Sequence, residues 1–148
     1  MGSTFLSLNY HLVFATKNRT PWIDSAWIDR LHEYLGGTIK GFAGHPLAVG
    51  GVADHVHLLV GLKATHTLAD LLRELKKASS KWVHDKIGLR DFAWQEGYAA
   101  FTVSPTALDA VRRYIANQEQ HHRRHDFPSE LRTLLKLAGI EYEERYLL

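Results

Sequence analysis

The chain has 148 residues, 45% of them hydrophobic and 23% charged, a composition typical of one globular domain. It contains no cysteine, which excludes disulfides, cysteine zinc sites and thiol catalysis. The 18 Lys and Arg residues barely exceed the 16 Asp and Glu residues, so net charge alone does not establish a polyanionic partner. With no apolar run near the roughly 20 residues of a membrane span and no signal-peptide pattern, we expect a cytoplasmic protein without a membrane anchor.

Hydrophobic periodicity predicts alternating strands and helices. The predicted strands cover residues 8–15, 46–49, 55–62 and 99–103, and the predicted helices cover residues 24–40, 67–82, 107–123 and 129–137. Gly50-Gly51 is predicted to be the turn between the second and third strands. The order β-α-β-β-α-β predicts an α+β fold of the ferredoxin-like split βαβ type, an antiparallel sheet with two helices on one face and an added C-terminal helix. Without repeats or linkers, residues 1–148 are expected to form a single domain.

Two histidines alternate in the third predicted strand. Because successive strand side chains point to opposite faces, His55 and His57 share one face and the apolar residues between them share the other. The apolar face should lie under the helices, which leaves both imidazoles on the open face, about 7 Å apart at their Cα atoms. That spacing allows both rings to bind one ion. Two surface histidines without a ligand explain the pattern equally well.

A second group of polar residues occupies the helix predicted over 107–123. Tyr114 and Gln118 are four residues apart and therefore share a helix face. A tyrosine can act as a covalent nucleophile, and a glutamine amide oxygen can bind a metal ion. Basic residues lie close to both. A packing tyrosine beside a solvated polar stripe is the common alternative.

These motifs, in this order, resemble the single-tyrosine transposases of the IS200/IS605 type, which carry a His-hydrophobic-His motif. The similar segments are Asp54-His55-Val56-His57-Leu58-Leu59, Tyr114-x-x-x-Gln118, the first strand from Tyr10 to Lys17, and Trp94-Gln95-x-Gly97-Tyr98. The resemblance extends from about Leu8 to Arg124. The chain equally resembles the members of this family that are found beside repeated palindromes in bacterial genomes.

The resemblance implies a metal-dependent enzyme that cuts and rejoins single-stranded DNA near hairpin ends. Tyr114 would attack the scissile phosphate, giving a 5′-phosphotyrosine and a free 3′-hydroxyl. His55, His57 and Gln118 would hold one Mg²⁺ or Mn²⁺, although two imidazoles and an amide also suit softer metals. Relatives of this type act as homodimers in which one subunit's tyrosine helix completes the other's site. Whether Tyr114 acts within its own chain is left open, and pairing through the edge strand near residues 97–103 is a plausible dimer contact.

The expected partner is single-stranded or hairpin DNA, bound through phosphate contacts. The predicted contact residues are Lys76, Lys77 and Lys81 on one helix and Arg112, Arg113 and Arg123 near the tyrosine helix.

Three alternatives compete with this interpretation. A non-catalytic or domesticated nucleic-acid-binding protein of the same fold could stack bases on Tyr10 and Phe14. A structural metal site could add His121 or His122 to the histidine pair, although these two diverge around a helix. A histidine-triad hydrolase is disfavoured, because Leu59 stands where its third histidine would be.

Overall fold

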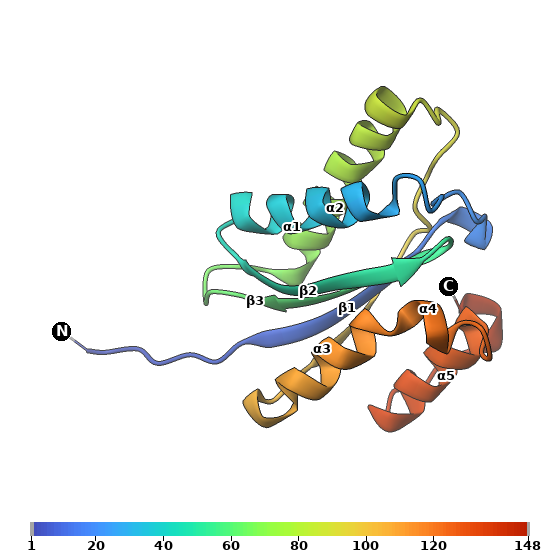
Figure 1. The fold of residues 1–148 in the computed structure, drawn as a ribbon. Coiled ribbons are helices and arrows are strands. Elements are labelled where there is room, and N and C mark those ends of the chain that lie inside the picture. Colours follow the sequence, from blue (N-terminus) through green and yellow to red (C-terminus); the bar gives the residue numbers. More distant parts are fainter. Residues whose placement is uncertain (1, 148) are drawn as a thin grey trace.

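The structure is a computed structural model that describes residues 2–147 (Figure 1). Four strands form one antiparallel sheet in the order β2-β3-β1-β4. The strands are β1 (Asn9–Ala15), β2 (His45–Val52), β3 (His55–Gly61) and β4 (Ala99–Thr102). The ferredoxin-like α+β prediction is confirmed. As predicted, β4 is an edge strand.

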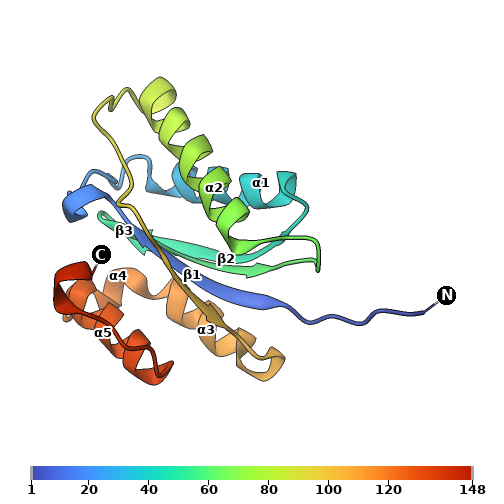
Figure 2. The same cartoon turned by 180° about the vertical axis from the view of Figure 1, so that it is seen from behind.

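Helices cover both faces of this sheet (Figures 1 and 2). On one face lie α1 (Ile28–Gly41) and α2 (Leu68–Trp82), and on the other lie α3 (Leu108–Ala116), α4 (Gln118–His121) and α5 (Phe127–Leu137). Short turns of 3₁₀ or π helix cover Lys17–Arg19, Val83–Ile87, Pro105–Ala107 and Glu144–Tyr146. The expectation that the histidines stand on an open face is therefore wrong. The C-terminal helices fold back over that face.

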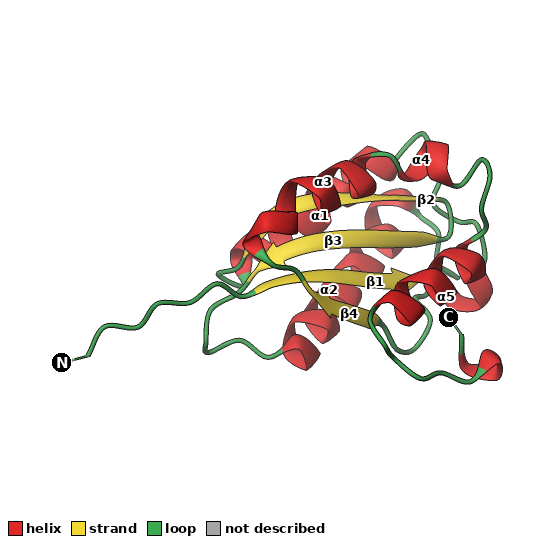
Figure 3. Ribbon diagram, turned by 90° about the horizontal axis from the view of Figure 1, so that it is seen from below, coloured by secondary structure: helices red, strands yellow, loops and turns green. Residues whose placement is uncertain are grey.

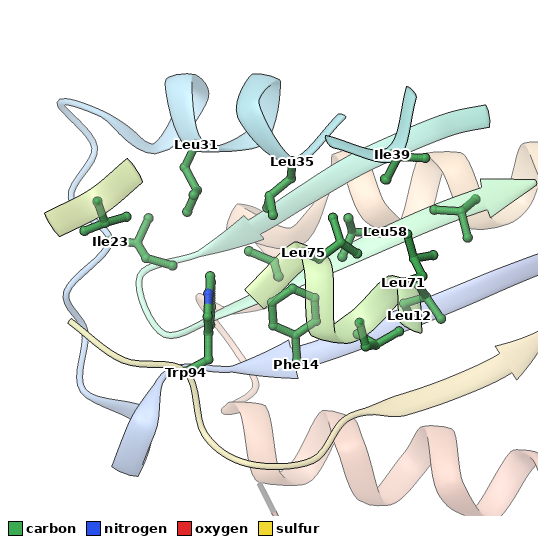
Figure 4. Close-up of a cluster of buried hydrophobic side chains, with 14 of the residues drawn as sticks. Leu12, Phe14, Ile23, Leu31, Leu35, Ile39, Leu58, Leu71, Leu75 and Trp94 are labelled. Carbon is green, nitrogen blue, oxygen red and sulfur yellow. The ribbon is translucent and has the colours of Figure 1, made fainter. Parts of the chain in front are cut away.

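The main hydrophobic core lies between the sheet and the pair α1 and α2 (Figure 4). Alternation along β1 and β3 sends Leu12, Phe14 and Leu58 into this core, where they are fully buried. The inner stripes of the two helices meet them, as Leu35 of α1 and Leu75 of α2 illustrate. The intervening strand residues must then face the opposite side, so this core determines where the histidines of β3 point.

The second and third strands differ from the prediction at their connection. Gly50 and Gly51 lie inside β2, and the turn to β3 falls at residues 53–54. A Cβ atom on Gly50 would lie 2.4 Å from the carbonyl oxygen of Ile115 in α3. Glycine at this position therefore lets α3 pack directly on β2, which brings the residue next to Ile115, Tyr114, close to β3.

The helix predicted over 107–123 is interrupted at Asn117, whose φ of −98° and ψ of 17° leave the helical region. Tyr114 thus ends up in α3 and Gln118 at the start of α4. The interruption turns the chain across the sheet and allows α5 to follow on the same face.

The last helix is positioned by a cap and a small apolar cluster. The Asp126 carboxylate accepts a hydrogen bond from the Ser129 amide at 2.9 Å, which begins α5. Phe127 and Leu131 of this helix are buried against Val13 and Ala15 of β1. Burial of this stripe places Glu130, which lies between them in sequence, over the histidine face of the sheet. No helix within residues 2–147 is both long and apolar enough to cross a membrane.

Candidate active site

The site is built on the face of β3 that points away from the main core. His55 and His57 are fully buried there. In the register of the sheet, His57 stands between Val13 of β1 and Gly50 of β2. Small neighbours in this row leave room for the imidazoles beneath α3, α4 and α5. The sequence prediction that both histidines share one face and converge is confirmed.

Glu130 of α5 is the centre of the site. Its Oε1 atom lies 3.1 Å from His57 Nε2, 3.2 Å from His55 Nε2 and 3.0 Å from His122 Nε2. The side chain is 1% exposed. A buried carboxylate is costly unless it is paired, and here three imidazoles from two separate segments surround one of its oxygens.

The second carboxylate oxygen contacts the two residues of the predicted tyrosine motif. Tyr114 donates its phenolic hydrogen to Glu130 Oε2, and Gln118 Nε2 donates to the same atom at 2.9 Å. The Gln118 Oε1 atom lies 3.1 Å from His55 Nε2 and can accept its hydrogen. The structure therefore brings together all four predicted residues, the two histidines, Tyr114 and Gln118, within one chain.

A second layer of contacts orients the histidines. The Asp54 carboxylate lies 2.7 Å from His55 Nδ1 and accepts its hydrogen. His11 of β1 lies behind His57, with 2.8 Å between His11 Nε2 and His57 Nδ1. Partners of this kind fix the tautomer and ring orientation of metal-binding histidines. Both contacts leave the Nε2 atoms of His55 and His57 facing Glu130.

The charges of the site are strongly coupled. Burial alone would lower the pKa of His55, but its hydrogen bonds to Asp54 and Glu130 outweigh this and raise the pKa to about 9. Burial and the neighbouring His57 lower the pKa of His11 to about 3. In the metal-free protein, His55 is thus charged and His11 is neutral at physiological pH.

The same coupling acts on the two acidic groups. Burial would raise the pKa of Glu130, but hydrogen bonds from the three histidines hold it far below its ordinary value. Burial and the Glu130 carboxylate raise the pKa of the Tyr114 phenol above its ordinary value. Tyr114 is therefore protonated at neutral pH, with its proton directed at Glu130.

The donor set of this cluster suits a divalent cation. One ligand atom from each of His55, His57, His122 and Glu130 can be chosen so that all lie within 4.8 Å of one another. Three neutral imidazole nitrogens and one anionic oxygen are ordinary ligands for divalent transition metals. The Gln118 amide oxygen, 3.1 Å from His55 Nε2, is a further candidate.

Comparison with known proteins places the chain in a family. The model of the family described as "Transposase IS200 like" matches residues 4–118, well over half of the chain. The chain belongs to the IS200-like transposase family. The family resemblance suggested by the sequence motifs is thereby confirmed.

Individual relatives of this IS200-like chain agree. The ISDra2 transposase TnpA of Deinococcus radiodurans is 25% identical over 118 residues, which are 75% of this chain and 84% of that protein. A crystal structure from D. radiodurans R1, of a protein assigned as a transposase, has a TM-score of 0.62 and 27% identity and covers 80% of this chain and 96% of its own. The REP-associated tyrosine transposase bound to a REP hairpin has a TM-score of 0.61 at 14% identity, with 82% and 73% covered, and so shares the fold.

Sequence reasoning missed three residues of this candidate site. Glu130, His122 and His11 were not assigned to it, and His122 was considered only for a structural metal site. Glu130 lies beyond residue 118, where the family match ends, and looks in sequence like any helix glutamate. The only sequence pattern that indicates its burial is its position between Phe127 and Leu131 on the apolar side of an amphipathic helix. That signal reveals burial but not which residues the carboxylate meets.

The predicted DNA-contact residues of this transposase chain fall on two sides of the sheet. Lys76, Lys77 and Lys81 belong to α2, across the sheet from Tyr114, whereas Arg112, Arg113 and Arg123 lie on the Tyr114 side (Figures 1 and 2). The half-buried Lys76 ammonium donates to the carbonyl oxygens of Gln95 at 2.8 Å and Gly97 at 2.5 Å. These contacts hold the segment that leads into β4. Lys76 is therefore engaged in contacts within the protein, on the opposite face of the sheet from the arginines.

Proposed function

We propose that this single domain cuts and rejoins single-stranded DNA near hairpin ends through a covalent bond to Tyr114, with the help of a divalent cation. The observation that carries the proposal is the convergence of Tyr114, Gln118 and the two histidines of β3 on one buried carboxylate. Such a network costs more to bury than an apolar core, and perturbed groups of this kind concentrate at catalytic sites.

In the proposed cleavage step, the Tyr114 oxygen forms a bond to the scissile phosphorus and the bond from phosphorus to the 3′-oxygen breaks. The DNA 5′-phosphate becomes linked to tyrosine, and the 3′-oxygen leaves as a hydroxyl after gaining a proton. Glu130 Oε2 accepts the hydrogen bond of the phenol and holds its oxygen in place. Because the pKa of Glu130 is strongly lowered, the phenolic proton passes to solvent rather than to this carboxylate, and solvent supplies the proton that the 3′-oxygen gains. Because the phosphotyrosine conserves the phosphodiester bond energy, attack by a 3′-hydroxyl reverses the step and rejoins DNA.

We further propose Mg²⁺ or Mn²⁺ as the cofactor, held by His55, His57 and Gln118 together with Glu130 and His122. A bound divalent cation would supply Lewis-acid chemistry, offsetting the negative charge of the attacked phosphate. The Glu130 oxygen suits these hard cations better than two imidazoles and an amide alone, and Mn²⁺ accepts imidazole nitrogen more readily than Mg²⁺ does. Asp54 keeps His55 Nδ1 protonated, so that Nε2 is the atom available for the cation.

The DNA partner is supported by the basic residues beside the tyrosine. Arg123 lines a pocket together with Tyr114, and Arg112 and Arg113 are exposed on α3. We assign the DNA phosphates to this side, with Lys77 and Lys81 of α2 as a separate contact. A fold relative was solved with a REP hairpin, which supports a hairpin ligand. A homodimer paired through β4 and a cytoplasmic location complete the proposal.

The test is covalent adduct formation with labelled single-stranded DNA from the flanks of the gene, analysed on denaturing gels with Mn²⁺. We expect an adduct with the wild-type protein and with Tyr98→Phe, an exposed tyrosine elsewhere. Tyr114→Phe should fold and bind the same DNA but form no adduct, because only the nucleophilic oxygen is removed. An adduct that persists in Tyr114→Phe overturns the assignment. DNA binding without any adduct in the wild type would instead support the non-catalytic alternative.

A further inference from the structure

A cavity of about 440 Å³ opens beside Tyr114, between α3 and α5. Figure 3, which views this side of the sheet, shows α3 along β2 and α5 over toward β4. The volume lies within the roughly 300–1,000 Å³ of small-ligand pockets. The α5 wall follows residue 118, where the family match ends, so this cavity depends on a segment outside the matched region.

The walls of the cavity are apolar and its inner end is polar. Ala110 and Val111 of α3 and Leu134 and Leu137 of α5 line the walls. Leu137 is 82% exposed. Exposure of a large apolar side chain to water is unfavourable, and a ligand in the cavity would cover it. Tyr114 and Glu130 line the same cavity. A flat ligand with one polar edge matches this distribution.

A second pocket, of about 610 Å³, adjoins the first and has the opposite character. Arg123 and Arg124 line it, and it shares Tyr114, His121 and His125 with the apolar cavity. Guanidinium groups are suited to phosphate. Tyr114 therefore stands at the junction between a cationic pocket and an apolar one, the two environments that the phosphate and the base of one nucleotide require.

An unsatisfied polar atom lies at the same junction. His121 Nε2 is buried and has no hydrogen-bond partner among residues 2–147, and its separation of 3.5 Å from Glu130 Oε2 is long for a hydrogen bond. The His121 ring lies 5.6 Å from the Tyr114 ring and 5.0 Å from the His125 ring. Buried polar atoms are normally paired, so this one points to a ligand that supplies the missing partner.

We propose that the cavity between α3 and α5 receives an unstacked nucleobase next to the scissile phosphate. The base enters between Val111 and Leu134, and His121 Nε2 contacts its polar edge. The adjoining phosphates lie at Arg123 and Arg124. The inference rests on the proposed DNA cleavage and adds to it a subsite that positions the phosphate at Tyr114.

The test compares two alanines of α3. Ala110 lines the cavity, whereas Ala116 lies on the same helix outside both pockets, and both are exposed. Ala110→Trp should fill the cavity and Ala116→Trp should not. The probe is the flank oligonucleotide that defines the cleaved phosphate, made intact and with a single abasic site on either side of that phosphate. Affinity is measured by fluorescence anisotropy without added divalent cation, so that the DNA stays intact.

For the wild type and Ala116→Trp, we expect one abasic position to weaken binding about tenfold, the size of the stacking energy that one base supplies. Ala110→Trp should bind intact DNA about tenfold more weakly and show no further weakening with the abasic DNA. Thr133→Trp, which enters the cavity from α5, should repeat this result. Thermal melting checks that each variant folds.

Three outcomes overturn the inference. First, Ala110→Trp and Thr133→Trp both bind intact DNA with the affinity of Ala116→Trp, which would mean that the cavity does not hold a base of this DNA. Second, the abasic site lowers the DNA affinity of Ala110→Trp by the same factor as that of the wild type, which would place the base outside the cavity. If the wild type forms an adduct but no abasic position weakens binding, the subsite fails while the proposed function stands. Absence of both DNA binding and adduct in the wild type defeats the proposed function itself.

Discussion

The phenol of Tyr114 donates a hydrogen bond to Glu130 Oε2, while the other oxygen of the same carboxylate lies 3.1 Å from His57 Nε2. One buried side chain thus joins the proposed nucleophile to the proposed metal ligands. Any change in the charge of Glu130 must therefore affect both.

Glu130→Gln keeps the shape of the side chain and removes its charge. We expect the affinity for Mn²⁺ to fall about 10- to 100-fold, as for removal of an anionic ligand or its close partner. Isothermal titration calorimetry measures this directly. Glu119→Gln, an exposed glutamate of α4, is the matched control and should bind Mn²⁺ like the wild type. Equal affinities in both variants would remove Glu130 from the metal site.

Metal binding should release a proton at neutral pH. Because the pKa of His55 is raised to about 9, its Nε2 atom carries a proton that a cation must displace. We expect about one proton released per Mn²⁺ at pH 7.5, and affinity that keeps rising up to about pH 9 rather than levelling off above pH 6.5. Calorimetry in buffers of different ionisation enthalpy measures the proton count. Release of no proton would mean that His55 is already neutral.

The raised pKa of His55 also sets a pH dependence of stability in the metal-free protein. A histidine whose folded pKa lies above its unfolded value of 6.5 stabilises the fold fully below pH 6.5, and this contribution disappears as pH rises through about 9. The free energy of unfolding should fall by a few kcal/mol over this interval. His55→Gln should remove the decrease, whereas His45→Gln, at an exposed position of β2, should retain it. Urea unfolding with a chelator at several pH values provides the measurement.

Lys76 and Lys77 are neighbours with different expected roles. Lys76→Met removes two hydrogen bonds to the segment before β4 and should lower the free energy of unfolding by about 1–2 kcal/mol. Lys77→Met changes an exposed side chain and should alter stability by less than about 0.5 kcal/mol. Denaturant titration separates the two. Equal stability would show that Lys76 is a surface cation after all.

The arginines beside Tyr114 should control the salt dependence of DNA binding. Removing an arginine that neutralises one phosphate lowers the slope of log affinity against log salt by about one. We therefore expect a shallower slope for Arg123→Ala, which lines the cationic pocket, than for Arg73→Ala, which pairs with Asp70 on α2. Anisotropy titrations between low and physiological salt measure both. A slope near zero in the wild type would contradict phosphate binding altogether.

The site is assembled within one chain, and this predicts the result of mixing inactive variants. Tyr114→Phe mixed with His55→Ala/His57→Ala should not recover cleavage, because each chain lacks part of its own site. Recovery after mixing would show that Tyr114 acts in the site of a partner, as in the dimeric relatives implied by the resemblance. Sedimentation of each variant, alone and mixed, shows whether the two chains associate.

The sequence alone determined the order of elements, the ferredoxin-like fold class and the convergence of the histidine pair. The face of His55 and His57 follows from a short-range rule, the alternation of side chains along a strand. Tyr114 and Gln118 both reach Glu130 Oε2 although the helix predicted to carry them is interrupted between them at Asn117. The family could be inferred because its motifs are local. Each of these features depends on neighbours within a few residues along the chain.

Only the tertiary structure decided what covers the histidine face. Gly50 was predicted as a turn residue, but it allows α3 to pack on β2, because a Cβ atom there would collide with Ile115. Glu130 and His11 reach the site from segments 73 and 46 residues away from His57. No periodicity encodes such a distance. The contact forms because the apolar stripe of α5 is buried on β1. That packing places the Glu130 carboxylate next to the imidazoles that compensate its charge.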